Sequence, residues 1–316
     1  MAMTDETKTR PATPDGQAPL ARPGPALDDA ATPPASAPPA SAPAADAATR
    51  PGPAPAPTAG RMPLGPPDAR LQIWEIVAVF AVSLGASGLY ALVNLIGSLT
   101  APQSLGKQTT VLNGSLAPGR PLLDLTLQLL NITLSLAPVL LVFYLLARAG
   151  EGPSSIGVDA SQPGRDLGRG TALAAIVGGT GLGLYLIAYH IGVELNVVAE
   201  NLPDIWWRIP VLLLSAFQNA VLEEVVVLGY LMSRLDRLGV RPRWAIVISA
   251  VVRGSYHLYQ GVGGFIGNAV MGALFGVLFR RWGRVTPMII AHFLIDSVAF
   301  VGYAVLAGHV SWLPRP

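Results

Sequence analysis

Residues 219–231, NAVLEEVVVLGYL, have the composition of a membrane-spanning helix, except that two carboxylates, Glu223 and Glu224, stand side by side within it. Placing an ionisable side chain at the centre of a bilayer costs roughly 3 kcal/mol on insertion scales, so such a residue indicates a functional site by default. Adjacent residues of a helix point about 100° apart, so both cannot face one cavity equally well. We expect one of them, Glu223, to meet a reacting centre and the other, Glu224, to be held by a partner.

The rest of the chain after residue 70 reads as membrane protein. The sequence is 51% hydrophobic and only 13% charged. Seven apolar segments are long enough to cross about 30 Å of hydrocarbon. The sequence therefore predicts an all-α fold, a polytopic membrane helix bundle of about seven transmembrane helices. The fifth and sixth segments are short, and the Gly-rich junction YQGVGGFIGN between them is typical of a broken or re-entrant stretch. The predicted spans lie near 73–99, 122–147, 168–192, 209–232, 244–260, 263–280 and 285–307.

Residues 1–70 have a different composition, with 17 of the 29 prolines and no aromatic residue. Such a segment buries too little apolar surface to offset its ordering entropy, which predicts a disordered tail. Its six Lys/Arg and seven Asp/Glu nearly cancel, so we expect no nucleic-acid binding. The chain has no cysteine, which excludes disulfides, thiol catalysis and Cys-based metal sites.

Basic residues are distributed unequally between the loops on the two faces of the predicted bundle. By the positive-inside rule, the face richer in arginine is cytoplasmic, which places the N-terminus in the cytoplasm and the C-terminus outside. One face carries Arg148, Arg165, Arg169, Arg234, Arg237, Arg241, Arg243, Arg280, Arg281 and Arg284, and the other carries Lys107, Arg120 and Arg208.

Ionisable residues within the predicted spans concentrate in the C-terminal half of the chain. At about 1.5 Å per helical residue, the side chains on three helices fall between ~10 and ~19 Å from the cytoplasmic ends of their spans. The pairs Arg253/His257 and His292/Asp296 are spaced i,i+4, so the members of each pair share a helix face. A shared site at mid-membrane depth is therefore expected from Glu223, Glu224, Arg253, His257, His292 and Asp296.

This group of side chains is suited to activating water. A carboxylate among Val and Leu side chains serves as a general base, and a nearby imidazole can protonate a leaving amine. The same residues could instead hold a divalent metal such as Zn, or donate hydrogen bonds to an oxyanion. Two other classes stay open: a non-catalytic membrane scaffold, and a proton-coupled transporter, since mid-depth carboxylates and imidazoles also suit proton relays. The polar residues occupy only one half of the chain, which disfavours a transporter built on inverted repeats.

The three motifs resemble those of the CPBP intramembrane proteases, also called the CAAX-protease or Abi family, whose pattern is E-E-x-x-x-R, F-x-x-x-H and H-x-x-x-N/D. Here they read EEVVVL from Glu223, RGSYH ending at His257 and HFLID from His292. The resemblance covers about residues 205–305. It divides the chain into the tail at 1–70, N-terminal transmembrane helices at 71–200 and a catalytic core at 201–308.

The resemblance implies that Glu223 activates water with assistance from His257. His292 and Asp296 would then provide an oxyanion site or, in a metalloprotease, metal ligands together with Glu223 and His257. Two positions depart from the family pattern: its Arg is Leu228 here, and its Phe is Arg253. We hypothesise that Arg253 reaches across to Glu224 and replaces the missing guanidinium; the competing interpretation is a degenerate, non-catalytic member.

The sequence thus predicts an intramembrane endopeptidase, and the family resemblance implies peptide or membrane-protein substrates. Its expected location is a bacterial cytoplasmic membrane, where family members are linked to peptide processing and bacteriocin immunity. A divalent metal and a metal-free mechanism are equally compatible with the motifs. The alternative from a different class is a non-catalytic scaffold or immunity protein, with a proton-coupled transporter third.

Overall fold

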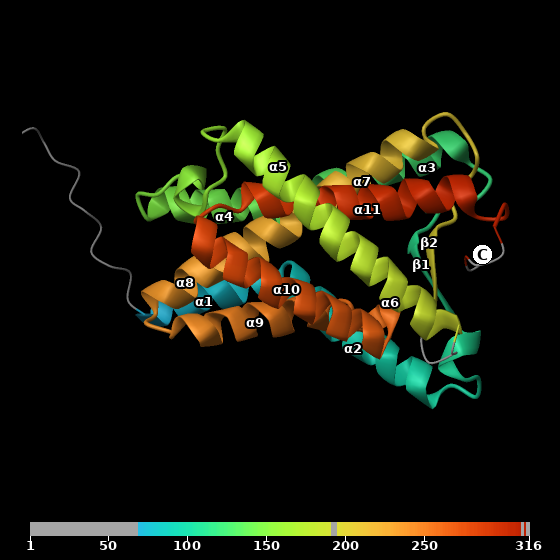
Figure 1. Ribbon diagram of the computed structural model, residues 1–316, viewed down its shortest axis with the longest axis horizontal. Helices are drawn as coiled ribbons and strands as arrows, with labels where there is room; N and C mark the ends of the chain where they lie inside the picture. Colours follow the sequence, from blue (N-terminus) through green and yellow to red (C-terminus); the bar gives the residue numbers. More distant parts are fainter. Residues whose placement is uncertain (1–68, 191–194, 311–312, 314–316) are drawn as a thin grey trace, which may run out of the picture. The chain divides into compact units, whose positions relative to one another are not determined.

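The computed structural model describes residues 69–190, 195–310 and 313, so the predicted tail at 1–70 lies almost entirely outside the described residues. The described part is a bundle of helices, which confirms the predicted fold class (Figure 1). Its helices are α1 Ala69–Ala81, α2 Leu84–Thr100, α3 Pro121–Ser135, α4 Ala137–Arg148, α5 Pro163–Leu173, α6 Gly179–His190, α7 Arg208–Glu223, α8 Leu231–Arg237, α9 Pro242–Ser255, α10 Val262–Trp282 and α11 Thr286–Leu306. Shorter elements are the 3₁₀-helices η1 Leu105–Lys107, η2 Pro153–Ile156 and η5 Leu258–Gln260, the π-helices η3 Ala174–Gly178 and η4 Glu224–Tyr230, and the strands β1 Thr109–Asn113 and β2 Asn196–Glu200.

The membrane spans largely follow the predicted segments but are fewer. Among the described residues, five helices are long and apolar enough to cross a membrane. A sixth span is added if α1 and α2 are taken together, although the chain bends by 55° between them. The five are Pro121–Arg148, Pro163–Ile187, Arg208–Arg237, Val262–Trp282 and Thr286–Leu306.

The span predicted at 244–260 is shorter than expected. Helix α9 ends at Ser255 after 14 residues, and the chain then turns through η5 to Gly261, whose φ of 106° suits glycine. Helix α10 starts at the next residue and packs back along α9. The Gly-rich junction is therefore the turn of a helical hairpin, and it leaves His257 beyond the end of α9.

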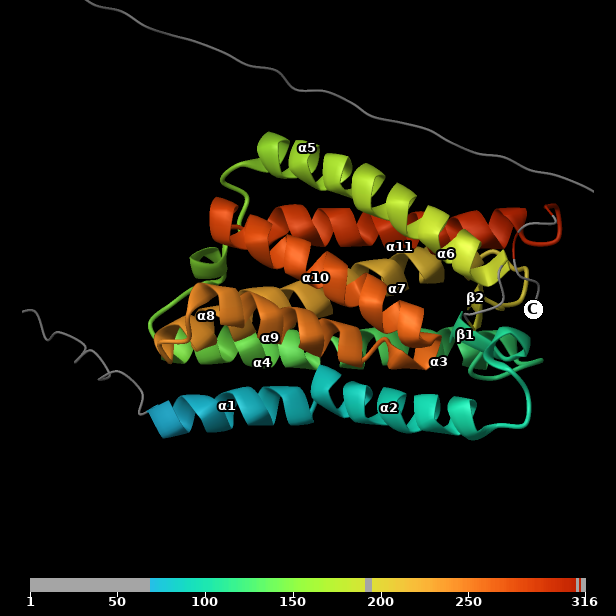
Figure 2. The ribbon, with the colours of Figure 1, turned by 60° about the horizontal axis from the view of Figure 1, so that its bottom comes forward.

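The helix formed by α7, η4 and α8 is the centre of the bundle. In its most apolar stretch 67% of the residues are buried inside the protein, against 11–33% for the other candidate spans. Figure 2 shows it between α1–α2 on one side and α5–α6 on the other, together with α10 and α11. The carboxylates in this helix therefore face protein rather than lipid.

The π-helical segment η4 directly follows Glu223 and carries the three consecutive valines of the opening stretch. Val225, Val226 and Tyr230 are completely buried and pack in one cluster with residues of α1 and α4. Wider π turns occur often at functional sites. This apolar packing on all sides holds the helix in place around its two carboxylates.

A short parallel sheet joins β1 and β2, with Thr109 opposite Asn196 and Asn113 opposite Glu200. The hydropathy pattern does not predict it, because both strands lie in polar connections between apolar segments. Their β-branched residues suit a pleated, half-buried surface. The sheet ties the connection after α2 to the connection before α7.

An ion cluster fastens the connection between α4 and α5 to the start of α11. The Arg284 guanidinium donates to Asp166 at 2.6 Å, to Asp159 at 3.0 Å and to the Ser161 hydroxyl at 2.9 Å. The hydrogen bond from Arg284 lowers the pKa of Asp159 to about 2, and the bond to Asp166 raises the pKa of Arg284. Gly157 passes so close that a Cβ there would lie 2.3 Å from the Arg284 Cα. The cluster closes the end of the bundle that the positive-inside rule assigns to the cytoplasm.

Candidate active site

The two adjacent carboxylates occupy different environments, as their helical spacing requires. Glu224 is completely buried, and its Oε1 accepts from Arg253 Nη2 at 2.6 Å and from His292 Nδ1 at 2.9 Å. Glu223 has a different set of neighbours, and Tyr256 donates its hydroxyl proton to Oε2 at 2.9 Å. Glu224 therefore has the partners of a structural carboxylate, whereas the Glu223 Oε2 that accepts from Tyr256 also faces His257.

The predicted contact between Arg253 and Glu224 is present. Arg253 lies on α9, is 1% exposed, and also approaches Glu223 Oε2 at 3.3 Å. Its guanidinium lies over the Phe275 ring, 5.4 Å from the ring centre. Gly272 on α10 leaves room for it, because a Cβ there would lie 2.9 Å from the Arg253 Cδ. One cation thus compensates two carboxylates in the interior of the bundle.

The position where the family pattern has its Arg is filled by an apolar side chain. Leu228 is buried in a cluster with Met232, Phe275 and Met288. Phe275 belongs to this cluster and also carries the Arg253 guanidinium on its face. The guanidinium therefore lies against a member of the cluster that contains Leu228, which is consistent with an exchange of positions between the two helices.

His257 lies in the turn after α9 and faces Glu223 without a direct hydrogen bond. Its Nε2 is 3.6 Å from Glu223 Oε2, which exceeds the usual hydrogen-bond range. Gln260 Nε2 donates to His257 Nδ1 at 3.2 Å, and the Tyr259 ring stacks on the imidazole at 6.4 Å. Because Nδ1 accepts this bond, a neutral His257 carries its proton on Nε2. A water beside this gap, rather than within it, could bond to both groups.

Helix α11 contributes His292 and Asp296 to the other side of the cluster. His292 Nδ1 lies 2.9 Å from Glu224 Oε1 and 3.1 Å from Arg253 Nη2, so this ring nitrogen is engaged by both members of the ion pair. The opposite nitrogen, Nε2, lies 3.6 Å from Asp296 Oδ2. Asp296 accepts from Asn219 Nδ2 at 3.3 Å. The structure thus brings all six predicted site residues into one connected group.

Two residues that bond to the carboxylates of this group, Asn219 and Tyr256, are not among the predicted site residues. Asn219 stands four residues before Glu223, so its position on the same helix face is visible in the sequence. Tyr256 directly precedes His257, and its contact with Glu223 depends on where α9 ends. Asn219 could therefore be found from its spacing in the sequence alone, whereas Tyr256 could not.

The geometry does not form a metal centre as it stands. Within residues 69–190 and 195–310, no group of three or more His, Asp or Glu side chains is arranged to hold a metal ion. The Arg253 cation lies between the two carboxylates, where it would repel a second positive charge. The metal set of Glu223, His257, His292 and Asp296 therefore stays a prediction.

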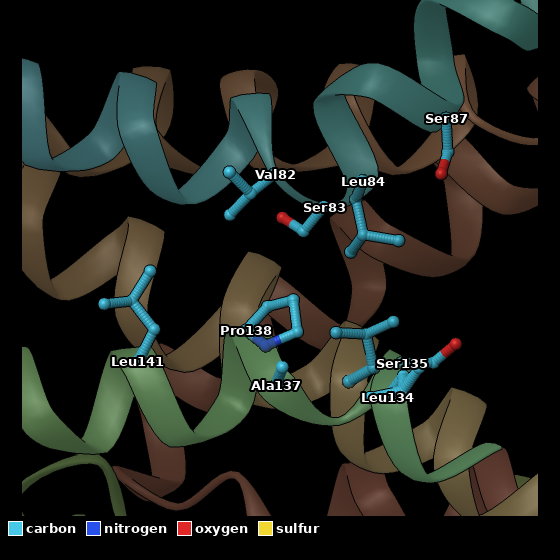
Figure 3. Close-up of a pocket in the computed structure, with 10 residues that line it drawn as sticks. Val82, Ser83, Leu84, Ser87, Leu134, Ser135, Ala137, Pro138 and Leu141 are labelled. Carbon is cyan, nitrogen blue, oxygen red and sulfur yellow. The ribbon is translucent and has the colours of Figure 1, made fainter. Parts of the chain in front are cut away.

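Two hollows lie along α2. The first, of about 580 Å³, lies where α1 breaks into α2 and α3 into α4, and Figure 3 shows Ser83, Pro138 and Leu141 around it. Leu222, the residue before Glu223, also lines it. The second, of about 520 Å³, lies between α2 and β1 and is lined by Tyr259, which stacks on His257. The first hollow thus reaches the helix that carries Glu223, and the second reaches the ring that stacks on His257.

Residues 205–298 match the family model described as Type II CAAX prenyl endopeptidase Rce1-like. The match runs from the residues before α7 into α11 and contains all six predicted site residues. No curated protein sequence and no solved structure matches the chain. The resemblance to the CPBP family of intramembrane proteases is confirmed over this segment, and the apolar helices indicate a multi-pass membrane protein.

Proposed function

We propose that this protein is an intramembrane endopeptidase in which Glu223 activates the hydrolytic water. The observation that carries the proposal is the 3.6 Å separation between Glu223 Oε2 and His257 Nε2 in the interior of the bundle. A water held by both groups is deprotonated by a carboxylate that the protein keeps out of bulk solvent. The Rce1-like match supports peptide-bond hydrolysis over proton transport.

The reaction follows from the two groups. Glu223 takes a proton from the water as the oxygen forms a bond to the scissile carbonyl carbon. The tetrahedral intermediate collapses, the C–N bond breaks, and the amine leaves with a proton returned by Glu223 or supplied by His257. The products are a carboxylic acid and an amine, so no other reactant is required.

Glu224 and Arg253 have a positioning role in this proposal. Their ion pair links η4 to α9, and the His292 imidazole is held by the same carboxylate oxygen. Tyr256 fixes one oxygen of Glu223 from the end of α9. Removing the ion pair would therefore act mainly by displacing the Glu223 carboxylate, and not by changing the charge at the scissile bond.

The experiment is cleavage of a peptide library by the purified full-length protein in lipid vesicles. Glu223→Gln keeps the shape of the side chain and removes the base, so cleavage should stop, and His257→Ala should stop it as well. Glu75→Gln on α1, a matched change at a distant carboxylate, should leave the rate unchanged. Full cleavage by Glu223→Gln would overturn the proposal, and no cleavage by the unaltered protein would favour the scaffold.

A chelator challenge in the same assay distinguishes the metal-dependent alternative. We expect cleavage to continue after metal removal, because the Arg253 cation already compensates the carboxylates. Loss of activity on chelation and recovery on adding Zn²⁺ would establish the metal-dependent mechanism instead. Glu223 is required in both mechanisms, so the result decides whether it acts as a general base or as a metal ligand.

We further propose that the protein lies in a bacterial cytoplasmic membrane with its N-terminus in the cytoplasm, on the basis of the arginine distribution. The chain has no cysteine, so single cysteines report their side of the membrane without background. Ser154→Cys, in η2, should be protected from an impermeant thiol reagent in intact cells. Ser104→Cys, before η1, should react. The reverse pattern would overturn the orientation.

A further inference from the structure

Asn219 shares a helix face with the proposed catalytic base. It lies on α7 one turn before Glu223 and is half-buried. Its amide nitrogen donates to Asp296 Oδ2 at 3.3 Å. An amide nitrogen carries two N–H groups, so this bond leaves one of them for another acceptor.

Hydrolysis at this site requires a hydrogen-bond donor for the oxyanion of the tetrahedral intermediate. The family resemblance assigns that role to His292 and Asp296. Asp296 as a carboxylate only accepts hydrogen bonds and would repel the oxyanion. His292 Nδ1 lies within hydrogen-bond distance of Glu224 Oε1 and Arg253 Nη2, and its Nε2 faces Asp296 Oδ2 at 3.6 Å. Both nitrogens of the imidazole are therefore directed at partners within the cluster.

We propose that Asn219 is the oxyanion donor of this protein and that Asp296 positions it. Asp296 holds one N–H of the amide and thereby directs the other towards the side of Glu223 on which substrate lies. The assignment rests on the proposed hydrolytic function. The assignment explains why Asp296 can occupy a position where an asparagine could donate directly to the oxyanion. In this protein the donating amide is on a neighbouring helix, at Asn219.

The expected effect is large and falls on the chemical step. Removing one oxyanion donor typically lowers kcat by about 10²–10³-fold, because the interaction forms only in the transition state. Asn219→Ala should therefore lower kcat by about that factor and change KM little. A purely structural amide would instead lower the unfolding temperature and leave kcat per folded molecule unchanged.

A rescue variant separates donation from packing. Asp296→Asn introduces an amide next to the vacated position, so Asn219→Ala combined with Asp296→Asn should recover at least about ten-fold in kcat over Asn219→Ala alone. Gln218→Ala, which removes the neighbouring buried amide on another face of α7, is the matched control. It should lower stability without changing kcat per folded molecule.

The outcome is read from kcat, KM and unfolding temperature of the full-length protein. Asn219→Ala with kcat within about three-fold of the unaltered protein would overturn the assignment, as would a double variant no faster than the single one. If Glu223→Gln also retained full activity, the proposed function itself would fall. If Glu223→Gln were inactive and Asn219→Ala fully active, only the oxyanion assignment would fail.

Discussion

Arg253→Met tests whether the interhelical ion pair holds the site together. The substitution keeps an unbranched side chain over Phe275 and removes the only guanidinium within 4 Å of Glu224 in the described structure. Breaking a buried pair by removing one partner costs about 3–5 kcal/mol, because the remaining charge is left without compensation. Arg253 also lies 3.3 Å from Glu223 Oε2, so we expect a loss of unfolding free energy near the upper end of this range. Folded domains have only about 5–15 kcal/mol of stability, so a third or more would be lost.

The assay is denaturant unfolding of the detergent-solubilised protein, arranged as a double-mutant cycle. Glu224→Gln removes the charge that Arg253 compensates, so Arg253→Met in that background should cost less by about 2 kcal/mol. The single Glu224→Gln variant should also lose cleavage, since Arg253 is left with Glu223 alone and would neutralise the proposed base. If Arg253→Met costs the same free energy of unfolding in both backgrounds, the ion pair is not what stabilises this region.

The exchange of positions between Leu228 and Arg253 can be reversed in the same assay. Arg253→Phe restores the family pattern at one position and should destabilise the protein by a similar amount. Adding Leu228→Arg places a guanidinium one turn after Glu224 on the same helix and in the cluster that contains Phe275. The double variant should recover part of the lost stability. A double variant no more stable than Arg253→Phe would refute the exchange.

Three further predictions address separate parts of the molecule. The pKa of Asp159 is about 2 in the folded protein against an ordinary 3.8, so the stabilising effect of its bond to Arg284 is complete above about pH 4 and is lost as the pH falls towards about 2. Asp159→Asn should remove that part of the pH dependence of the unfolding free energy. An unchanged pH profile would contradict this. Gly157→Ala should destabilise the protein by at least about 1 kcal/mol, because φ at Gly157 is 69° and the added Cβ would meet the backbone of Arg284. Gly164→Ala has open space around its Cβ and should be neutral or stabilising in unfolding measurements. Equal effects of the two substitutions would contradict this explanation. Tyr256→Phe removes a 2.9 Å hydrogen bond to the proposed base and should lower kcat about ten-fold with little change in KM, whereas an unchanged kcat would show that the bond does not position the carboxylate.

Sequence patterns predict this site well where one helix supplies the information. The different partners of Glu223 and Glu224 follow from the rotation per residue, and the i,i+4 spacing places His292 beside Asp296 on α11. The Arg253–Glu224 contact is also predictable, since a buried carboxylate without a partner is too unstable to persist. In each case the physical constraint acts within a helix or on a single charge.

Contacts that depend on where a helix ends are not predictable in this way. Hydropathy extends the fifth span to residue 260, but α9 stops at Ser255, and the turn that follows places Tyr256 on Glu223 and His257 opposite it. A difference of five residues at the helix end changes the direction of every later side chain. The same limitation applies to β1 and β2, whose pairing joins segments far apart in the sequence.

The location of the guanidinium on α9 changes what the ion pair does for the fold. An Arg at position 228 would pair with Glu224 along a single helix and would not hold α9 in place. Arg253 instead links α9 to η4, and Tyr256 and His257 directly follow the end of α9. The charge that makes Glu224 compatible with the core therefore also positions the residues that face Glu223. Because one interaction serves both purposes, substitutions at Arg253 should lose stability and cleavage together, whereas Glu223→Gln should lose cleavage alone.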